Sequence, residues 1–491
     1  RDIGVTGVQT CALPICTLRY FSVAVLLLVV VTLLVMNDFA SLWNGAEASL
    51  AWESAAPGGS HILPAMFLNW VWEQTHGNLF LMRLPSVVWL LMAGAGFFYL
   101  ARPLFGLRTT VTALLVAGTS MGLPNLAKMA TPDSWLFALH LIGFVLLLRH
   151  IKQPDRDWRW WFYAVVFASG LIAPWSSLVY FSMLAVFILG RPGQARQLWR
   201  LQAWLPALLA VAVCWFSGTL EWRPDWFFVH QNRPGGYLLL LLGYLPFAGF
   251  ILSGLRDYAP KLHKGDEMAV LIFAGFMAGM MAQSPAIYFV PALLIARQMD
   301  AYFLPVFPYR NFVKAGAVLH LIAAFFGSLI LFFGGVYYLQ GAGFRVAALI
   351  AGAYWSMSFV GVIGLYGMHR RWAIGGPILA GAFALLLFWL SGYPLLESRR
   401  KLELDLTNAL PADAEALVYV QCGYHEALPA VAAYVRREFP QTTFVANERK
   451  VSGLKRPFYL ISRTEIVSCA SMFRADSTAA ALRLYHCLQT E

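Results

Sequence analysis

Long runs of apolar residues, interrupted by short clusters of charged residues, proline and glycine, recur from residue 18 to residue 392. A helix needs about 20 mainly apolar residues to cross about 30 Å of hydrocarbon, and cutting the chain at the interruptions gives roughly thirteen such segments. The pattern therefore predicts an all-α polytopic membrane protein, with a transmembrane domain over 17–392. The expected spans are residues 18–36, 81–101, 109–123, 132–148, 160–173, 176–190, 201–218, 237–253, 267–282, 285–299, 315–339, 345–366 and 373–392.

Residues 393–491 have a different pattern, with more charge and few long apolar runs. Short runs rich in β-branched and aromatic residues predict strands, and apolar residues at helical spacing predict helices. The expected strands are 416–421, 442–446 and 457–462, and the expected helices are 427–438 and 477–488. We therefore expect a small α/β domain at this end. It shows no phosphate-binding glycine loop and no nucleophile elbow, which favours a docking or lid role over catalysis.

The segment 38–76 is the one long connection early in the chain. After Asp38, apolar residues recur at helical spacing with Ser, Asn and Glu between them, until Pro57 and the glycines after it break the pattern. A second run of this kind covers 63–74 and is rich in Trp and Met. Tryptophan is typical of the membrane interface, so the pattern predicts two amphipathic helices lying on the membrane surface.

The composition excludes a soluble protein. Hydrophobic residues make up 59% of the chain and charged residues 12%, whereas soluble domains carry about 25% charged residues. The net charge of +11 would suit a nucleic-acid-binding protein if the basic residues gathered on one surface. The basic residues instead lie between the hydrophobic spans, so we expect no nucleic acid partner.

The positions of Lys and Arg predict the orientation, because cytoplasmic loops carry an excess of them. Between residues 17 and 392, eighteen lie in alternate loops on the side of Arg19, in stretches such as 149–159 and 191–200. The five on the other side in this part of the chain are Arg83, Lys128, Arg223, Arg233 and Arg345. The N-terminus is therefore expected in the cytoplasm, and an odd number of spans places 38–76 and 393–491 outside.

Residues 1–16 stand apart from the rest of the chain. They contain no Met, and 1–15 resemble the translated read-through of a sequencing adapter more than a natural leader. We expect this stretch to be an artefact and exclude it from the fold prediction.

Several short motifs resemble one family of membrane enzymes. Asp38 follows the first span directly, the two amphipathic helices come next, and Arg83-Leu84-Pro85-Ser86 opens the second span. Ala130-Thr131-Pro132-Asp133 then stands at the start of the fourth span. This order resembles the lipid-linked-sugar glycosyltransferases of the GT-C fold, in particular the aminoarabinose (lipid A) transferase and protein O-mannosyltransferase group, which is glycosyltransferase family 39-like.

The resemblance implies a function and a location. It implies an integral-membrane glycosyltransferase that moves a sugar from a polyprenyl-phosphate donor to an external acceptor such as lipid A, a glycan or a protein. It also implies the bacterial plasma (inner) membrane, with the reaction on the external, periplasmic face. The expected partners are thus the lipid-linked sugar, the acceptor and membrane lipid.

The chain departs from the family pattern at four places. Asn37-Asp38-Phe39 leaves one carboxylate where the family usually has an acidic pair, and His61-Ile62-Leu63-Pro64 replaces a Lys-Pro-Pro stretch. A lysine usually found near the break at Pro174 is absent, and Thr131-Pro132-Asp133 lacks the usual arginine. These departures keep a second reading open, in which the chain is a non-catalytic scaffold with the same fold.

The implied chemistry needs a carboxylate and cations at the external surface. The carboxylate removes a proton from the acceptor hydroxyl, and the cations stabilise the departing lipid phosphate. The topology places Asp38 and Asp133 at the same external depth, and we expect Asp38 to be the general base and Asp133 to contact a sugar. The candidates for binding the donor phosphate are Arg83, Lys128, His61, Arg223 and Arg233.

Each candidate also has a purely structural reading. Asp38 suits an N-cap, and Asp133 lies in a first helical turn, where a carboxylate complements the helix dipole. Arg83 can snorkel at a span end, and His61 is a loop residue. Arg223 and Arg233 belong to a loop that can simply border the membrane.

No cofactor is expected. Divalent cations need several oxygen ligands close together, and one carboxylate after the first span makes a required metal doubtful. A lipid flippase or transporter is a further alternative. However, ion-coupled transporters place paired ionisable residues within their spans and often contain inverted repeats, and neither feature is found in this sequence.

Overall fold

The computed structural model describes residues 12–35, 37, 63–75, 78–153, 158–189, 201–216, 243–397, 417–420, 443–445, 458–462, 470–477 and 480–487. The chain separates into two compact units. The first, here the helical unit, comprises 1–37, 61–64 and 83–393, and the second comprises 38–60, 65–82 and 394–491. The first predicted amphipathic helix and the helix predicted over 427–438 lie outside the described residues.

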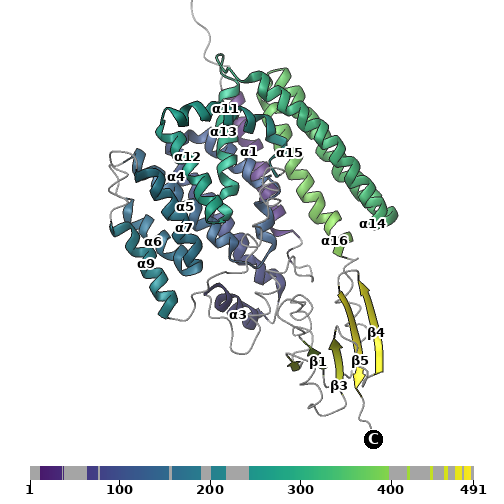
Figure 1. The fold of residues 1–491 in the computed structure, drawn as a ribbon. Helices are drawn as coiled ribbons and strands as arrows, with labels where there is room; N and C mark the ends of the chain where they lie inside the picture. Colours follow the sequence, from purple (N-terminus) through teal and green to yellow (C-terminus); the bar gives the residue numbers. More distant parts are fainter. Residues whose placement is uncertain are drawn as a thin grey trace, which may run out of the picture. The chain divides into compact units, whose positions relative to one another are not determined.

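The described part of the helical unit is built almost wholly of helices (Figure 1). Its α-helices are α1 (Ala12–Leu34), α4 (Leu79–Gly118), α5 (Asp133–Lys152), α6 (Arg159–Ile172), α7 (Pro174–Leu189), α9 (Leu201–Phe216), α11 (Ala248–His263), α12 (Glu267–Met281), α13 (Phe289–Tyr302), α14 (Arg310–Tyr366) and α15 (Arg370–Leu387). Short 3-10 turns are η1 (Pro124–Lys128), η3 (Leu245–Phe247) and η4 (Pro285–Tyr288), and a π-helical turn, η5 (Phe388–Gly392), leads into α16 (Tyr393–Glu397). The second predicted amphipathic helix is confirmed as α3 (Leu63–Thr75).

Five of the described helical segments are long and apolar enough to cross a membrane. They are Leu79–Gly118, Asp133–Lys152, Arg310–Tyr337, Gly343–Tyr366 and Arg370–Leu395. Shorter apolar helices lie between them in sequence. The helical membrane protein predicted from hydropathy is thus confirmed, while the number of thirteen spans stays a prediction.

Several helix boundaries and kinks coincide with proline, serine and glycine residues in the sequence. Pro174 opens α7 directly after α6, as expected for a residue whose fixed φ suits a first helical turn and which lacks an N–H to continue a helix. The Ser284 hydroxyl accepts a hydrogen bond from Ala286 N and so caps η4. Two predicted spans, 81–101 and 109–123, form the single helix α4, which kinks at Gly106, where φ is 78°. Only glycine adopts such a φ at little cost.

The helix α14 is a hairpin of two spanning segments, as the predicted spans 315–339 and 345–366 imply. The ring centroids of Phe332 and Phe344 lie 4.6 Å apart, whereas twelve residues of straight helix would separate them by about 18 Å. A Cβ built on Gly335 would lie 2.9 Å from the carbonyl oxygen of Gly343. The chain therefore reverses between these glycines, and both segments run beside α15 in Figure 1.

Glycines set the distance between α14 and α15. A Cβ built on Gly376 of α15 would lie 2.6 Å from Gly361 Cα and 2.7 Å from Met357 O of α14. Such backbone contact is typical of membrane helices, which pack through small residues because lipid supplies no hydrophobic driving force between them.

We expect Gly376→Ala to destabilise the protein by about 1–3 kcal/mol, because the added methyl must push two backbones apart. The control is Gly352→Ala on the same hairpin, where a Cβ would meet no atom within 4 Å. The apparent Tm in detergent measures the effect. Equal Tm values for the two variants would show that the contact is not tight.

The second unit contains a five-stranded sheet of order β2-β1-β3-β5-β4. Its strands are β1 (Leu417–Val420), β2 (Thr443–Val445), β3 (Phe458–Ser462), β4 (Ala470–Ser477) and β5 (Ala480–Cys487). The strands β2, β1 and β3 are parallel, while β5 pairs antiparallel with both β3 and β4. The three predicted strands are confirmed. The helix predicted over 477–488 is wrong, because this segment is β5 and lies between two strands.

Candidate functional site

The C-terminal end of α1 is tied to α4 and to η1 through Asn37. The Arg83 Nη1 group donates to the Asn37 carbonyl oxygen at 3.1 Å. The Asn37 Nδ2 group in turn donates to Leu33 O at 3.0 Å and to Ala127 O at 3.4 Å. Asn37 and Arg83 are both fully buried. Since the last carbonyls of a helix have no partner within it, these donors satisfy the end of α1.

Lys128 approaches the same helix end from η1. Its Nζ donates to Leu33 O at 3.2 Å and to Val35 O, where the negative end of the helix dipole favours a cation. The Nζ atom also lies 4.9 Å from the ring centroid of Trp389, whose Nε1 donates to Asn125 Oδ1 at 3.1 Å. An ammonium group has three donors, and the two carbonyls take two of them.

The segment after Lys128 is fixed against α4 and carries Asp133. The Ser86 hydroxyl donates to Met129 O at 2.7 Å, and the Thr131 hydroxyl donates to Asp133 Oδ2 at 2.9 Å. Asp133 is 1% exposed and is the first residue of α5, where the helix dipole stabilises its negative charge.

These bonds place two candidate cations and a candidate carboxylate in one buried network. Arg83, Lys128 and Asp133 come from three different elements and are joined through Asn37, Ser86 and the backbone of 127–131. The other candidates lie outside the described residues: Asp38, His61, Arg223 and Arg233. Asp38 directly follows Asn37 in the chain, whose carbonyl oxygen is held by Arg83.

Burial and neighbouring charge set the proton affinities in this network. Burial, and next the positive charge of Arg83, lower the pKa of Lys128 to about 7. Lys128 therefore changes its charge near neutral pH.

Sequence reasoning missed the residues that hold this network. Ser86 and Thr131 lie inside the motifs that carried the resemblance, but they act there through hydrogen bonds to the backbone and to Asp133. Trp389 lies in the last predicted span, and nothing in the sequence pairs it with Lys128. His140 in α5 is a buried core histidine, since both its ring nitrogens contact serine hydroxyls, at 2.7 Å and 3.1 Å.

Asp133 is the one carboxylate in the buried network formed by the described residues. Among the described residues, no group of three or more His, Cys, Asp or Glu side chains comes together. In the buried network a single carboxylate, Asp133, accompanies two basic side chains, whereas Mg²⁺ and Ca²⁺ prefer several oxygen ligands.

Comparison with solved structures establishes the fold. The crystal structure of ArnT from Cupriavidus metallidurans bound to undecaprenyl phosphate aligns with 95% of this chain and 98% of its own, at a TM-score of 0.64 and 16% identity. The apo structure of the same protein aligns with 96% of this chain and 98% of its own, at a TM-score of 0.63 and 15% identity. The chain has a GT-C fold.

Sequence comparison agrees with this GT-C fold over part of the chain. Residues 62–222 match the family model described as dolichyl-phosphate-mannose-protein mannosyltransferase. This stretch includes Arg83, Lys128 and Asp133. No curated protein sequence matches the chain. The resemblance inferred from the motifs after the first span is therefore confirmed by both the family match and the fold.

Proposed function

We propose that the chain is an integral-membrane glycosyltransferase that moves a sugar from a polyprenyl-phosphate donor to an acceptor outside the membrane, such as lipid A, a glycan or a protein. The observation that carries the proposal is the buried network of Arg83, Lys128 and Asp133. It occurs in a GT-C fold shared with a protein that was crystallised with undecaprenyl phosphate. The proposed location is the inner membrane of a bacterium, with the N-terminus in the cytoplasm and residues 393–491 in the periplasm.

In the proposed reaction, the acceptor hydroxyl attacks the anomeric carbon and inverts it. The new bond joins the acceptor oxygen to this carbon, and the bond between the carbon and the phosphate oxygen breaks. The proton passes to the Asp38 carboxylate, and the electron pair leaves with the polyprenyl phosphate.

Cations stabilise the charge that develops on the leaving phosphate. Arg83 and Lys128 supply two of these cations, and His61, Arg223 and Arg233 are proposed to add to them. Asp133 is proposed to hold a sugar hydroxyl. Hydrogen bonds to the backbone at and just after the end of α1 fix the positions of Lys128 and Arg83.

The test uses the full chain in lipid nanodiscs with a panel of undecaprenyl-phosphate-linked hexoses and pentoses. Release of undecaprenyl phosphate, followed by mass spectrometry, is expected for at least one donor. Asp133→Asn should reduce it, while Asp257→Asn, at an ion pair with Lys261, should not. Binding of undecaprenyl phosphate without turnover would favour a scaffold or a flippase. The absence of both binding and turnover would overturn the proposal.

Donor binding should depend on pH through Lys128. With a pKa of about 7, its ammonium form dominates below pH 7 and is lost above it, so affinity for undecaprenyl phosphate should fall as pH rises from 6 to 8.5. The phosphate titrates in the same range. The readout is therefore the difference from Lys128→Arg, which keeps its charge throughout. Parallel pH profiles for the two proteins would show that Lys128 does not meet the phosphate.

A further inference from the structure

A cavity with charged side chains in its lining lies at the other end of the helices that carry the candidate site. It has a volume of about 640 Å³ and is formed by the kinked part of α4 and by the ends of α5, α12, α13 and α15. Helix α5 runs from Asp133 at the candidate site to Lys152 at this cavity, and 20 helical residues span about 30 Å. The cavity is therefore separate from the proposed reaction. Its lining residues are Leu104, Phe105, Arg108, Thr109, Lys152, Met268, Arg297, Asp300, Ala301, Leu304 and Arg370.

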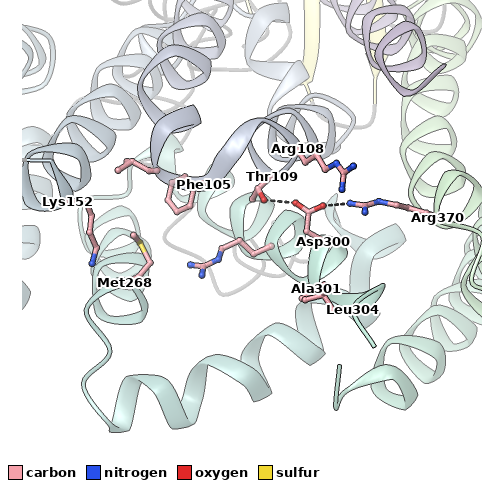
Figure 2. Close-up of a pocket in the computed structure, with 11 residues that line it drawn as sticks. Phe105, Arg108, Thr109, Lys152, Met268, Asp300, Ala301, Leu304 and Arg370 are labelled. Atoms are coloured by element: carbon pink, nitrogen blue, oxygen red, sulfur yellow. Dashed lines mark hydrogen bonds and ion pairs between the residues drawn. The ribbon is translucent and has the colours of Figure 1, made fainter. Parts of the chain in front are cut away.

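The charged lining is strongly basic, with four cationic side chains and a single carboxylate. That carboxylate, Asp300, is already occupied: its Oδ2 accepts from the Thr109 hydroxyl at 2.6 Å, and its Oδ1 accepts from Arg370 Nη2 at 2.5 Å. Figure 2 shows this group at one end of the cavity, with Lys152 and Met268 at the other end. Lys152 pairs with Glu267 at 2.5 Å, and both side chains are over one third exposed.

Two arginines remain without a carboxylate partner in the part of the chain that the structure describes. Arg108 is exposed and lines the cavity next to Thr109. The Arg297 guanidinium lies 5.6 Å from the ring centroid of Tyr258, which leaves its N–H donors available. Planar guanidinium groups match phosphate oxygens in geometry and charge.

We infer that this cavity binds a phosphate-bearing headgroup, with Arg108 and Arg297 as the main contacts. Apolar residues line the cavity beside the arginines, among them Phe105, Met268 and Leu304, so it offers contact to a glycerol or acyl portion as well as to the phosphate. The cavity also lies among the loops in which Lys and Arg are concentrated, which is the side predicted to face the cytoplasm. Basic pockets between membrane helices on that side suit anionic phospholipids.

The experiment uses the full chain, delipidated in a neutral detergent. Native mass spectrometry with dioleoylphosphatidylglycerol and dioleoylphosphatidylcholine measures lipid binding, and calorimetry with inorganic phosphate measures binding of the free anion. We expect phosphatidylglycerol to bind more tightly than phosphatidylcholine, and Arg108→Gln/Arg297→Gln to weaken this binding by about tenfold. The matched control is Arg102→Gln/Lys264→Gln, which removes two exposed cations that do not line the cavity.

The arms of the experiment separate the sources of the phosphate. Loss of phosphatidylglycerol binding in the cavity variant alone identifies a lipid headgroup, and loss of inorganic phosphate binding identifies a soluble ligand. Equal binding by wild type and cavity variant in both arms overturns the inference, as does an equal loss in the control. If the double variant does not fold, the same binding measurements are made with Arg108→Gln alone. This exposed side chain contacts no carboxylate in the described structure, so its replacement should not disturb folding.

Discussion

Replacing Asp38 with Asn is expected to lower the rate of sugar transfer by about 10²- to 10⁴-fold, the usual contribution of a general base. The amide keeps the shape of the side chain but cannot accept the acceptor's proton. Since the proposed role concerns only the reacting hydroxyl, the Kd for undecaprenyl phosphate should change little. Transfer in nanodiscs and binding in the same preparation measure the two quantities separately.

The control for Asp38→Asn is Glu267→Gln, which removes a carboxylate paired with Lys152 at the other end of α5. This variant should keep its transfer rate. A loss of transfer together with a lower Tm in Asp38→Asn would instead identify Asp38 as a helix cap, since losing a cap typically costs about 1 kcal/mol. Unchanged transfer would remove Asp38 from the mechanism.

Replacing Lys128 with Met should lower kcat/KM by about 10²- to 10³-fold, which is typical when one preorganised group that stabilises developing charge is lost. Methionine has nearly the length of lysine and packs well against an aromatic ring such as Trp389. The substitution therefore removes the cation while filling its space. Steady-state kinetics with the donor found in the nanodisc assay measures the effect.

Lys128 also caps the carbonyls of α1, so the test must separate this structural role from the proposed one. Lys128→Arg keeps the charge and the donors and should retain a substantial part of the activity. A lower Tm with an unchanged kcat/KM in Lys128→Met would mean that Lys128 only stabilises the C-terminal end of α1 and takes no part in transfer. Lys264→Met, at an exposed position, reports any general effect of removing a lysine.

The fold was largely predictable because hydropathy and proline report directly on membrane helices. The break at Pro174 and the two segments of α14 were expected, since each follows from a local rule. The segment 480–487 was not, because its Ala, Leu and Arg residues favour a helix in isolation. Its strand conformation comes from pairing with β3 and β4 on its two sides, a tertiary effect that overrides local propensity.

The sequence indicated which charged residues of the candidate site share one side of the membrane, but it did not indicate the contacts that hold them. Topology alone brought Arg83, Lys128 and Asp133 to one surface. The partners that hold them, Asn37 and Trp389, act through a backbone carbonyl and a ring face. Neither kind of contact can be recognised from a single sequence. The cavity at Arg108 and Arg297 was not predictable either, because one sequence does not show which helix ends meet in space.

The hairpin of α14 bears on how the chain is assembled during synthesis. Residues 315–344 and 346–366 contain no Lys, Arg, Asp or Glu, so both segments can leave the translocon for lipid as soon as they emerge. Helix α15, which packs against them, is translated afterwards. In this interval the contacts at Phe332, Phe344 and Gly335 allow the nascent hairpin to close on itself, and α15 then docks onto a preformed surface.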